Sequence, residues 1–342
     1  MTQQLGWTEN WGRSYRVTLG TREYRKLDEV VQETLVSAPS IALEPKDSDY
    51  TTIPSNAVFM SNLEEEGYSK RGFSFKFNSS QKASSKGGEG ENSFLELYNL
   101  SPDVVEIINQ DKCIVMIEAG YQQKVSLVYS GDVVEVTSRR QGADMVYRIK
   151  CSAGSLPMRN TLSSLAYEES LSDGDIILDM VSRFPGTALG TYGLGEAEGT
   201  YKVGGNNFTG KLATNFDKMM EKHHLNYSYI NGKIVIIPYR FTGKDYDTFA
   251  RTNYNLTEDV LKGVTPITDN SKNSSADIKS KLSKLQINTF FIPIEIGQFV
   301  TVPESSYENI NRYAGTYVVK GRRLILNSQG GSWDVVLEVG EV

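Results

Sequence analysis

The stretch from Phe94 to Cys151 decides the fold, and it reads FLELYNLSPDVVEIINQDKCIVMIEAGYQQKVSLVYSGDVVEVTSRRQGADMVYRIKC. Its apolar residues come in short runs rich in Val, Ile and Tyr, and Gly, Asn, Asp and Pro separate the runs. Runs of this length predict a strand, a turn and short helix, and then four more strands. The polar, Gly-containing segment Gln141–Asp144 predicts a hairpin turn between the last two strands. The stretch therefore indicates an antiparallel β-barrel or sandwich.

A weaker copy of this pattern closes the chain. Residues 131–149 and 315–339 each start with a Gly-led strand, pass an Arg pair and a Gly-rich turn, and end in a returning strand. The pattern favours one small β-module used twice. Any two hairpins share these features, so two unrelated hairpins remain an equal alternative.

Composition bounds the class of protein. At 342 residues the chain is long enough for two or three domains. It is 39% hydrophobic with a mean hydropathy of −0.37, and no apolar run approaches the roughly 20 residues that span a bilayer. The first residues lack the pattern of a signal peptide, so we expect synthesis in the cytoplasm and no membrane insertion. A net charge of −6 argues against a sequence-independent nucleic-acid binder.

Changes in composition and in the spacing of apolar residues along the chain predict three domains. Residues 1–152 predict a first β-barrel, with an insertion at about 27–69, a short helix at 28–35 within it, and a mobile loop at 78–93. Residues 153–239 predict a small α/β domain. Residues 240–342 predict a second β-barrel with a mobile loop at about 269–284. The predicted class is thus mainly β with an α+β insert.

Helical spacing and one turn motif define the middle domain. Apolar residues recur at helical spacing over 161–171, 175–184 and 208–223. Asn231–Gly232 lies between two alternating runs, which is a strong hairpin signal.

A phosphate-loop pattern, GxxxxGK, spans Gly205–Lys211. The next residue is Leu212, where a magnesium-binding Ser or Thr is required, and no apolar strand leads into the pattern. A loop before a helix, with Lys211 in solvent, explains it better.

The remaining polar candidates also lack the chemistry of a site. His223 and His224 are adjacent at a predicted helix end and point about 100° apart, so they are poorly placed to chelate one metal ion; partial charge at a helix C-terminus favours them there. Glu196 and Glu198 lie in a Gly-rich loop, a poor platform for paired carboxylates, and the run 64–66 of three Glu is typical of solvated surface. We therefore predict no catalytic, cofactor or metal site and no enzyme activity.

Cys113 and Cys151 are the two cysteines, and both fall in apolar strand contexts. No CxxC or Cys/His cluster suggests zinc, and a disulfide scaffold would contain more cysteines. We expect two buried free thiols.

Taken in order, these segments resemble the central baseplate hub protein of contractile-tailed bacteriophages. The resemblance rests on short motifs from residue 73 onward: FLELYNLS at 94–101, IEAGY at 117–121, YSGDV at 129–133, GVTP at 263–266, IGQFV at 296–300 and GTYVV at 315–319. It implies two barrels related to the tail-tube subunit with a small α/β domain between them. It also implies a place in the virion tail baseplate.

The resemblance implies partners as well. Three copies would form a ring of six barrels that matches a six-fold tail tube on one face to a three-fold spike on the other, beside baseplate wedge proteins. The ring would form part of the DNA channel without specific DNA binding, and an acidic wall would let DNA slide. The chain departs from the family pattern in its insertion at about 27–69 and in lacking a lysozyme-like segment after Val342, which speaks against a cell-wall hydrolase. A tail-tube or tube-terminator protein is the alternative, and a tail-associated hydrolase a weaker one.

Overall fold

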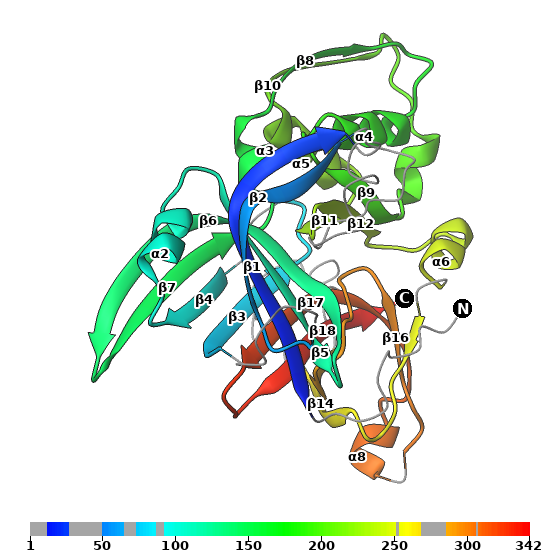
Figure 1. Cartoon of the computed structure of the whole chain (residues 1–342). Coiled ribbons are helices and arrows are strands. Elements are labelled where there is room, and N and C mark those ends of the chain that lie inside the picture. The colour runs from blue at the N-terminus through cyan, green and yellow to red at the C-terminus, as the bar shows by residue number, and fades with distance from the viewer. Residues whose placement is uncertain are drawn as a thin grey trace, which may run out of the picture.

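The computed structural model (Figure 1) describes seven segments of the chain: residues 12–26, 50–64, 73–86, 92–250, 253–267, 285–305 and 307–342. Strands dominate the first and last parts of the chain. The first part contains β1 (Arg13–Lys26), β2 (Tyr50–Ser61), β3 (Phe75–Lys82), β4 (Asn92–Tyr98), α2 (Pro102–Ile108), β5 (Cys113–Tyr121), β6 (Lys124–Gln141) and β7 (Asp144–Ser152).

The middle part alternates helices and short strands. It contains α3 (Ser155–Asn160), β8 (Leu162–Tyr167), α4 (Asp173–Ser182), β9 (Ala188–Tyr192), the 3₁₀ helix η1 (Gly195–Gly199), β10 (Asn206–Lys211), α5 (Leu212–Lys222), β11 (Leu225–Ile230) and β12 (Lys233–Pro238). The last part contains α6 (Gly243–Ala250), β13 (Asn253–Asn255), β14 (Leu261–Pro266), β15 (Leu285–Phe290), β16 (Phe299–Val302), α8 (Glu308–Asn311), β17 (Gly315–Asn327) and β18 (Trp333–Glu341).

One hydrogen-bonded sheet runs through the first and last parts. Its strand order is β14-β15-β18-β17-β3-β4-β7-β6-β5-β1-β2, with β13 and β16 attached beside β17. The two parts join where β17 pairs antiparallel with β3, over Gly321–Asn327 and Lys76–Lys82. The predicted mainly β fold is confirmed. Within the described residues no pairing joins β2 to β3, and β14 pairs only with β15, so neither predicted barrel is closed and both halves belong to one shared sheet.

Two long strands turn this sheet around the core. β6 pairs with β5 up to Asp132 and with β7 from Asp132 onward, and β17 pairs with β16 up to Val318 and with β3 from Gly321 onward. Each strand has a β-bulge at its corner, between Val133 and Glu135 and between Val319 and Gly321. A bulge bends a strand and increases its twist, so the same device forms both corners.

A single hydrophobic core lies under both halves. Tyr15 and Phe75 from the first half pack with Phe291 and Trp333 from the second half, with ring centroids 4.9–6.4 Å apart. Aromatic pairs at this spacing stabilise a fold beyond what the burial of their surface area contributes, so they fix the two halves against each other.

The middle part shares a strand layer with this core. In β12, Ile234 and Ile236 belong to the core of the α/β unit, while Val235 and Ile237 on the opposite face belong to the core under the large sheet. Ser84, just after β3, exchanges two backbone hydrogen bonds with Tyr227 of β11, 3.0 and 2.8 Å long. The α/β unit is therefore packed directly onto the β halves.

Several predicted elements are confirmed. Strands β4, β5 and β7 lie where the stretch was expected to form strands, and α4 matches the helix at 175–184. Three strands follow α2 instead of the four expected, because β6 continues through Gly131 and Asp132 as one strand. Asn231 and Gly232 have φ values of 50° and 81°, as a type I′ hairpin turn requires. Both cysteines are buried and free.

Other predictions were wrong. Residues 162–167 form strand β8 instead of part of a helix, and Phe208–Lys211, the expected start of another helix, belong to β10. The two strands pair antiparallel, with Leu162 opposite Lys211 and Tyr167 opposite Asn206. Twelve residues of the expected insertion at 27–69, Tyr50–Ser61, form strand β2, which pairs antiparallel with β1. In the loop expected at 78–93, β3 continues to Lys82. The helix expected at 28–35 and the loop at 269–284 lie outside the described residues.

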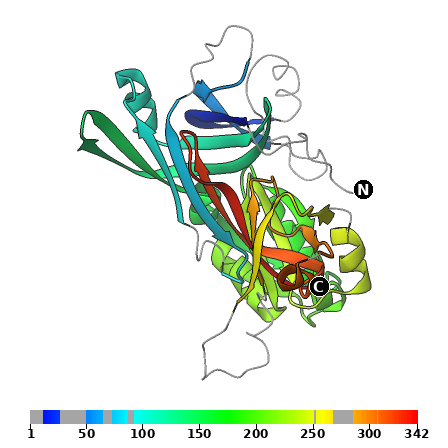
Figure 2. The ribbon, with the colours of Figure 1, turned by 90° about the horizontal axis from the view of Figure 1, so that it is seen from below.

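Figures 1 and 2 show the β6–β7 hairpin and α2 extending away from the rest of the molecule. The two-stranded β8–β10 sheet lies at the far side of the α/β unit in Figure 1. In the described part of the chain, every helix is too short or too polar to cross a bilayer.

Candidate functional site

The phosphate-loop pattern does not form a phosphate loop. Asn206–Lys211 is a strand paired with β8, and Lys211 is exposed at its end. A phosphate cradle needs a loop whose backbone N–H groups converge ahead of a helix. The structure therefore supports the solvated Lys211 that the sequence favoured.

The paired glutamates are not a catalytic pair either. Glu198 accepts two hydrogen bonds of 2.9 Å from Lys244 Nζ at the surface. Glu196 lies at the rim of a separate small hollow. Glu64 is exposed, and the other two glutamates of its run lie outside the described residues.

His223 has a specific tertiary partner that the sequence did not reveal. Its Nε2 lies 2.8 Å from Oδ2 of Asp173, a fully buried carboxylate in the first turn of α4. Lys222 Nζ donates to the same oxygen at 2.5 Å and Asn206 Nδ2 to the other at 3.1 Å. Burial alone would raise the pKa of Asp173, but the hydrogen bonds from Lys222 and His223 outweigh it and hold this pKa below its usual value.

A hollow of about 250 Å³ lies beside this cluster, lined by Gly195, Glu196, His223, His224, Pro238, Tyr239 and Arg240. These lining residues include no Ser, Thr or Cys, so His223 and Asp173 have no nucleophile to activate there. Cys113 is buried elsewhere, and burial raises its pKa to about 11, which disfavours the reactive thiolate. The cluster thus holds α4 and α5 together.

Replacing Asp173 with Asn is expected to lower the free energy of unfolding at pH 7 by about 2 kcal/mol. The variant replaces the buried carboxylate that pairs with Lys222 and His223 by a neutral amide, so both side chains lose their charged acceptor. A carboxyl whose pKa is lower in the folded state stabilises the fold above its unfolded pKa. That contribution is lost as pH falls through the folded pKa. Urea unfolding between pH 7 and pH 3 should therefore show a flatter pH dependence in the variant. Asp247→Asn, at an exposed site, should retain the wild-type profile, and equal slopes in all three proteins would contradict the prediction.

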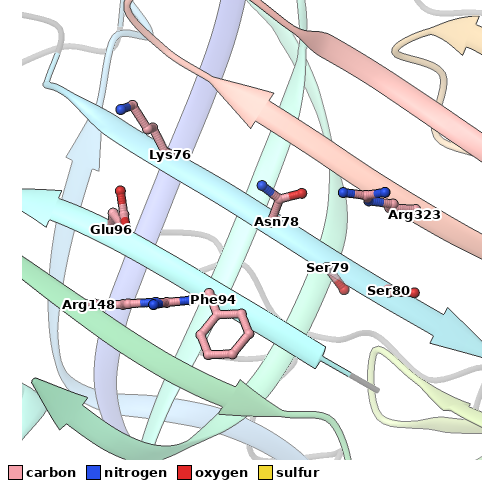
Figure 3. A pocket seen from close by; sticks show the side chains of 8 residues that line it. All are labelled: Lys76, Asn78, Ser79, Ser80, Phe94, Glu96, Arg148 and Arg323. Carbon is pink, nitrogen blue, oxygen red and sulfur yellow. The ribbon is translucent and has the colours of Figure 1, made fainter. Parts of the chain in front are cut away.

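A larger hollow of about 510 Å³ lies on the outer face of the shared sheet, over β3, β4, β7 and β17 (Figure 3). Side chains of β3 alternate between the two faces of the sheet. Phe75 and Phe77 point into the core, so Lys76 and Asn78 point outward toward the hollow. Register then lines up Lys76, Glu96 and Arg148 across three strands. The other lining residues are Ser79, Ser80, Phe94 and Arg323.

Among the residues that the structure describes, the cations around this hollow form no ion pair, and two of them contact aromatic rings. The Arg148 guanidinium lies 4.3 Å from the Phe94 ring centroid, and Lys76 Nζ lies 5.8 Å from that of Tyr98. Within the described part of the chain, Lys76, Arg148 and Arg323 form no ion pair. Glu96 also lines the hollow, so three positive charges and one negative charge surround it, and the balance favours an anionic group.

The hollow is the centre of a longer polar face. This outer face covers eight consecutive strands, β6-β7-β4-β3-β17-β18-β15-β14. It carries the cations Lys76, Lys82, Arg139, Arg148, Lys150, Lys262 and Arg323 and the anions Glu96, Glu135, Asp144, Asp334 and Glu338. The face is thus net cationic although the chain is net acidic, because total charge does not determine which side of each strand a charged residue occupies.

Both ends of this eight-stranded run are free edges in the described structure. Residues 133–141 of β6 pair only with β7, and β14 pairs only with β15. A free edge presents unpaired N–H and C=O groups that can pair with another chain.

Comparison with protein-family models and with curated proteins finds no match. Solved structures do match. A type VI secretion component of E. coli, c3393, described as similar to T4 bacteriophage tail proteins gp27 and gp5, aligns with a TM-score of 0.50 and 9% identity over 81% of this chain and 76% of that one. A chain of the Francisella PdpA–VgrG complex aligns with a TM-score of 0.50 and 8% identity over 96% of this chain and 58% of that one.

A 43 kDa tail protein of prophage MuSo2 from Shewanella oneidensis also aligns, with a TM-score of 0.48 and 9% identity over 79% of this chain and 93% of that one. The solved structures that this chain resembles are thus phage tail proteins and type VI secretion spike-related proteins. At 8–9% identity the likeness concerns the fold alone.

Proposed function

We propose that this chain is a structural protein of a phage-type tail, and that three copies form a hub ring at the tail tip. The carrying observation is the eight-stranded run, which consists of two four-stranded halves in one sheet and has, within the described residues, free edges at both ends. Copies joined head to tail through such edges close into a ring. Three copies supply six similar halves, which reconciles a six-fold tube with a three-fold spike.

The proposed partners follow from this arrangement. One face of the ring binds the tail-tube protein, the other binds the spike, and wedge proteins surround it in the baseplate of the virion. The outer face of the eight-stranded run faces the channel, so DNA meets a net cationic wall instead of the acidic wall expected from the net charge. Cations of this kind contact phosphates without reading sequence. The proposed role is not enzymatic.

The alternative is a tail-tube or tube-terminator protein. The presence of two similar β halves in one chain favours the hub, because a six-fold tube needs only one such half per chain. A cell-wall hydrolase finds no support in the residues that line the two hollows.

Native mass spectrometry of the full chain is expected to show a trimer as the largest stable species. A closed ring of three two-part chains satisfies every edge, whereas a fourth chain would not fit. A hexamer would favour the tube protein. Electron microscopy of the assembled tail tip would then place the chain, and a position away from the central axis would sink the hub assignment.

A further inference from the structure

The two β halves repeat each other strand by strand. From the free edge of β6 the first half runs β6-β7-β4-β3, and from the internal junction the second runs β17-β18-β15-β14. The bulge pairs that start each hairpin also correspond: Val133 lies opposite Cys151, and Val319 lies opposite Val339. A shared bulge at the same step supports a duplicated module more strongly than a shared hairpin shape.

The correspondence continues across the sheet without a gap. Cys151 lies opposite Ser93, which lies opposite Ser79 of β3. In the second half, Val339 lies opposite Leu285, which lies opposite Pro266 of β14. Pro266 therefore occupies in the second half the position of Ser79 in the first, and Thr265 occupies that of Asn78.

The internal junction then serves as a template. Asn78 of β3 lies opposite Ile325 of β17, six residues after the bulge position Val319. The residue six positions after the equivalent Val133 is Arg139 of β6. Because β14 and residues 133–141 of β6 are both free edges in the part of the chain that the structure describes, the same pairing is open to them between two copies.

We infer that β14 of one copy pairs antiparallel with β6 of the next copy, with Thr265 opposite Arg139. This inference rests on the proposed ring and specifies its junction. The partner is a second copy of this chain, and the pairing extends the sheet from copy to copy.

The chemistry of the two edges agrees with a junction that forms only on assembly. At the internal junction Leu324 and Leu326 are buried, whereas Ser138 and Arg140 take the corresponding places in β6 and are exposed. Charged residues on a free edge protect it from unspecific pairing.

Charged residues flank both edges. Arg139 and Arg140 lie at the end of the β6 edge, and both are exposed. Glu258 and Asp259 lie shortly before β14, α8 with Glu308 packs beside it, and Lys262 lies in β14 itself. In the inferred register Val264 lies opposite Arg140, so the acidic pair lies beyond the end of β6 and acts on association through long-range attraction instead of direct contact.

Cysteine cross-linking of the full chain tests the register. In the double variant Arg139→Cys/Thr265→Cys, the two cysteines lie directly opposite each other across the inferred junction, where Cβ atoms are about 5 Å apart. Mild oxidation should produce disulfide-linked dimers and trimers on a non-reducing gel. The matched control Glu135→Cys/Thr265→Cys places its cysteines four residues out of register, about 13 Å away along the strand, and should give at least about tenfold less product.

The outcomes separate the junction from the ring. A trimer by native mass spectrometry without the in-register cross-link overturns this junction and leaves the hub proposal standing. Equal cross-linking of both double variants overturns the register. A chain that stays monomeric at all concentrations and gives no cross-link overturns both proposals.

Discussion

Replacing Trp333 with alanine is expected to lower the free energy of unfolding by about 3–5 kcal/mol, the largest effect of any single substitution proposed for this chain. Trp333 is 2% exposed, and its ring packs against Tyr15, Phe75 and Phe291 from both β halves. Truncation would leave a cavity where these rings meet, and the rigid sheet around it cannot collapse to fill it. Urea unfolding followed by far-ultraviolet circular dichroism would measure the loss.

Trp333→Phe is the matched control. The indole Nε1 is buried without a hydrogen-bond partner in the described structure, so phenylalanine sacrifices packing but no hydrogen bond. We expect this variant to lose less than about 2 kcal/mol. If the alanine and phenylalanine variants were equally stable, the ring cluster would not be what joins the two halves.

Replacing Arg322 with methionine is expected to lower the free energy of unfolding by about 3 kcal/mol. Arg322 is 3% exposed and donates to the side-chain oxygen of Gln81 and to the backbone oxygens of Ile294 and Val128, over 2.7–3.2 Å. These acceptors come from β3, from the segment after β15 and from β6. Methionine keeps much of the volume but satisfies none of the acceptors, which remain buried.

Arg323→Met provides the control for this prediction in the next residue of the same strand. Arg323 points to the opposite face, into the open hollow over β3, and forms no ion pair within the described residues. Its replacement should change stability by less than about 0.5 kcal/mol. Thermal unfolding of both variants would distinguish them, and similar midpoints would show that Arg322 is not a joint between the halves.

Local sequence patterns predicted those parts of the fold that depend on neighbours in the chain. The runs around Ile114–Ile117 and Val146–Ile149 are apolar, β-branched and bounded by turn residues, and they form β5 and β7. The Asn231–Gly232 turn follows because few residues other than Gly and Asn adopt positive φ at low cost. The repeated Gly-led hairpin indicated a module used twice, and the paired bulges of β6 and β17 agree with it.

Local patterns failed where a distant partner decides the conformation. The 161–171 segment carries apolar residues at helical spacing, yet β10, about 40 residues later, holds part of it as a strand. Strand β2 has Pro54, Ser55 and Asn56 in its middle, which interrupt its strand-forming residues, and its pairing with β1 defines it. The short polar end of β3 extends to Lys82 because β17, more than 230 residues later, pairs with it.

The candidate sites divide in the same way. The sequence by itself determined that no metal, nucleotide or nucleophile motif was complete, because those chemistries need particular residue types at fixed spacing. It also placed Lys76 on the polar side of its strand, through the alternation Phe-Lys-Phe. Only the tertiary structure decided that Arg148 and Arg323 share a hollow with Lys76, that Asp173 lies under His223, and that both halves form one sheet with two free edges. Strand register and sheet order bring together residues far apart in the chain, and no local pattern encodes which edge meets which.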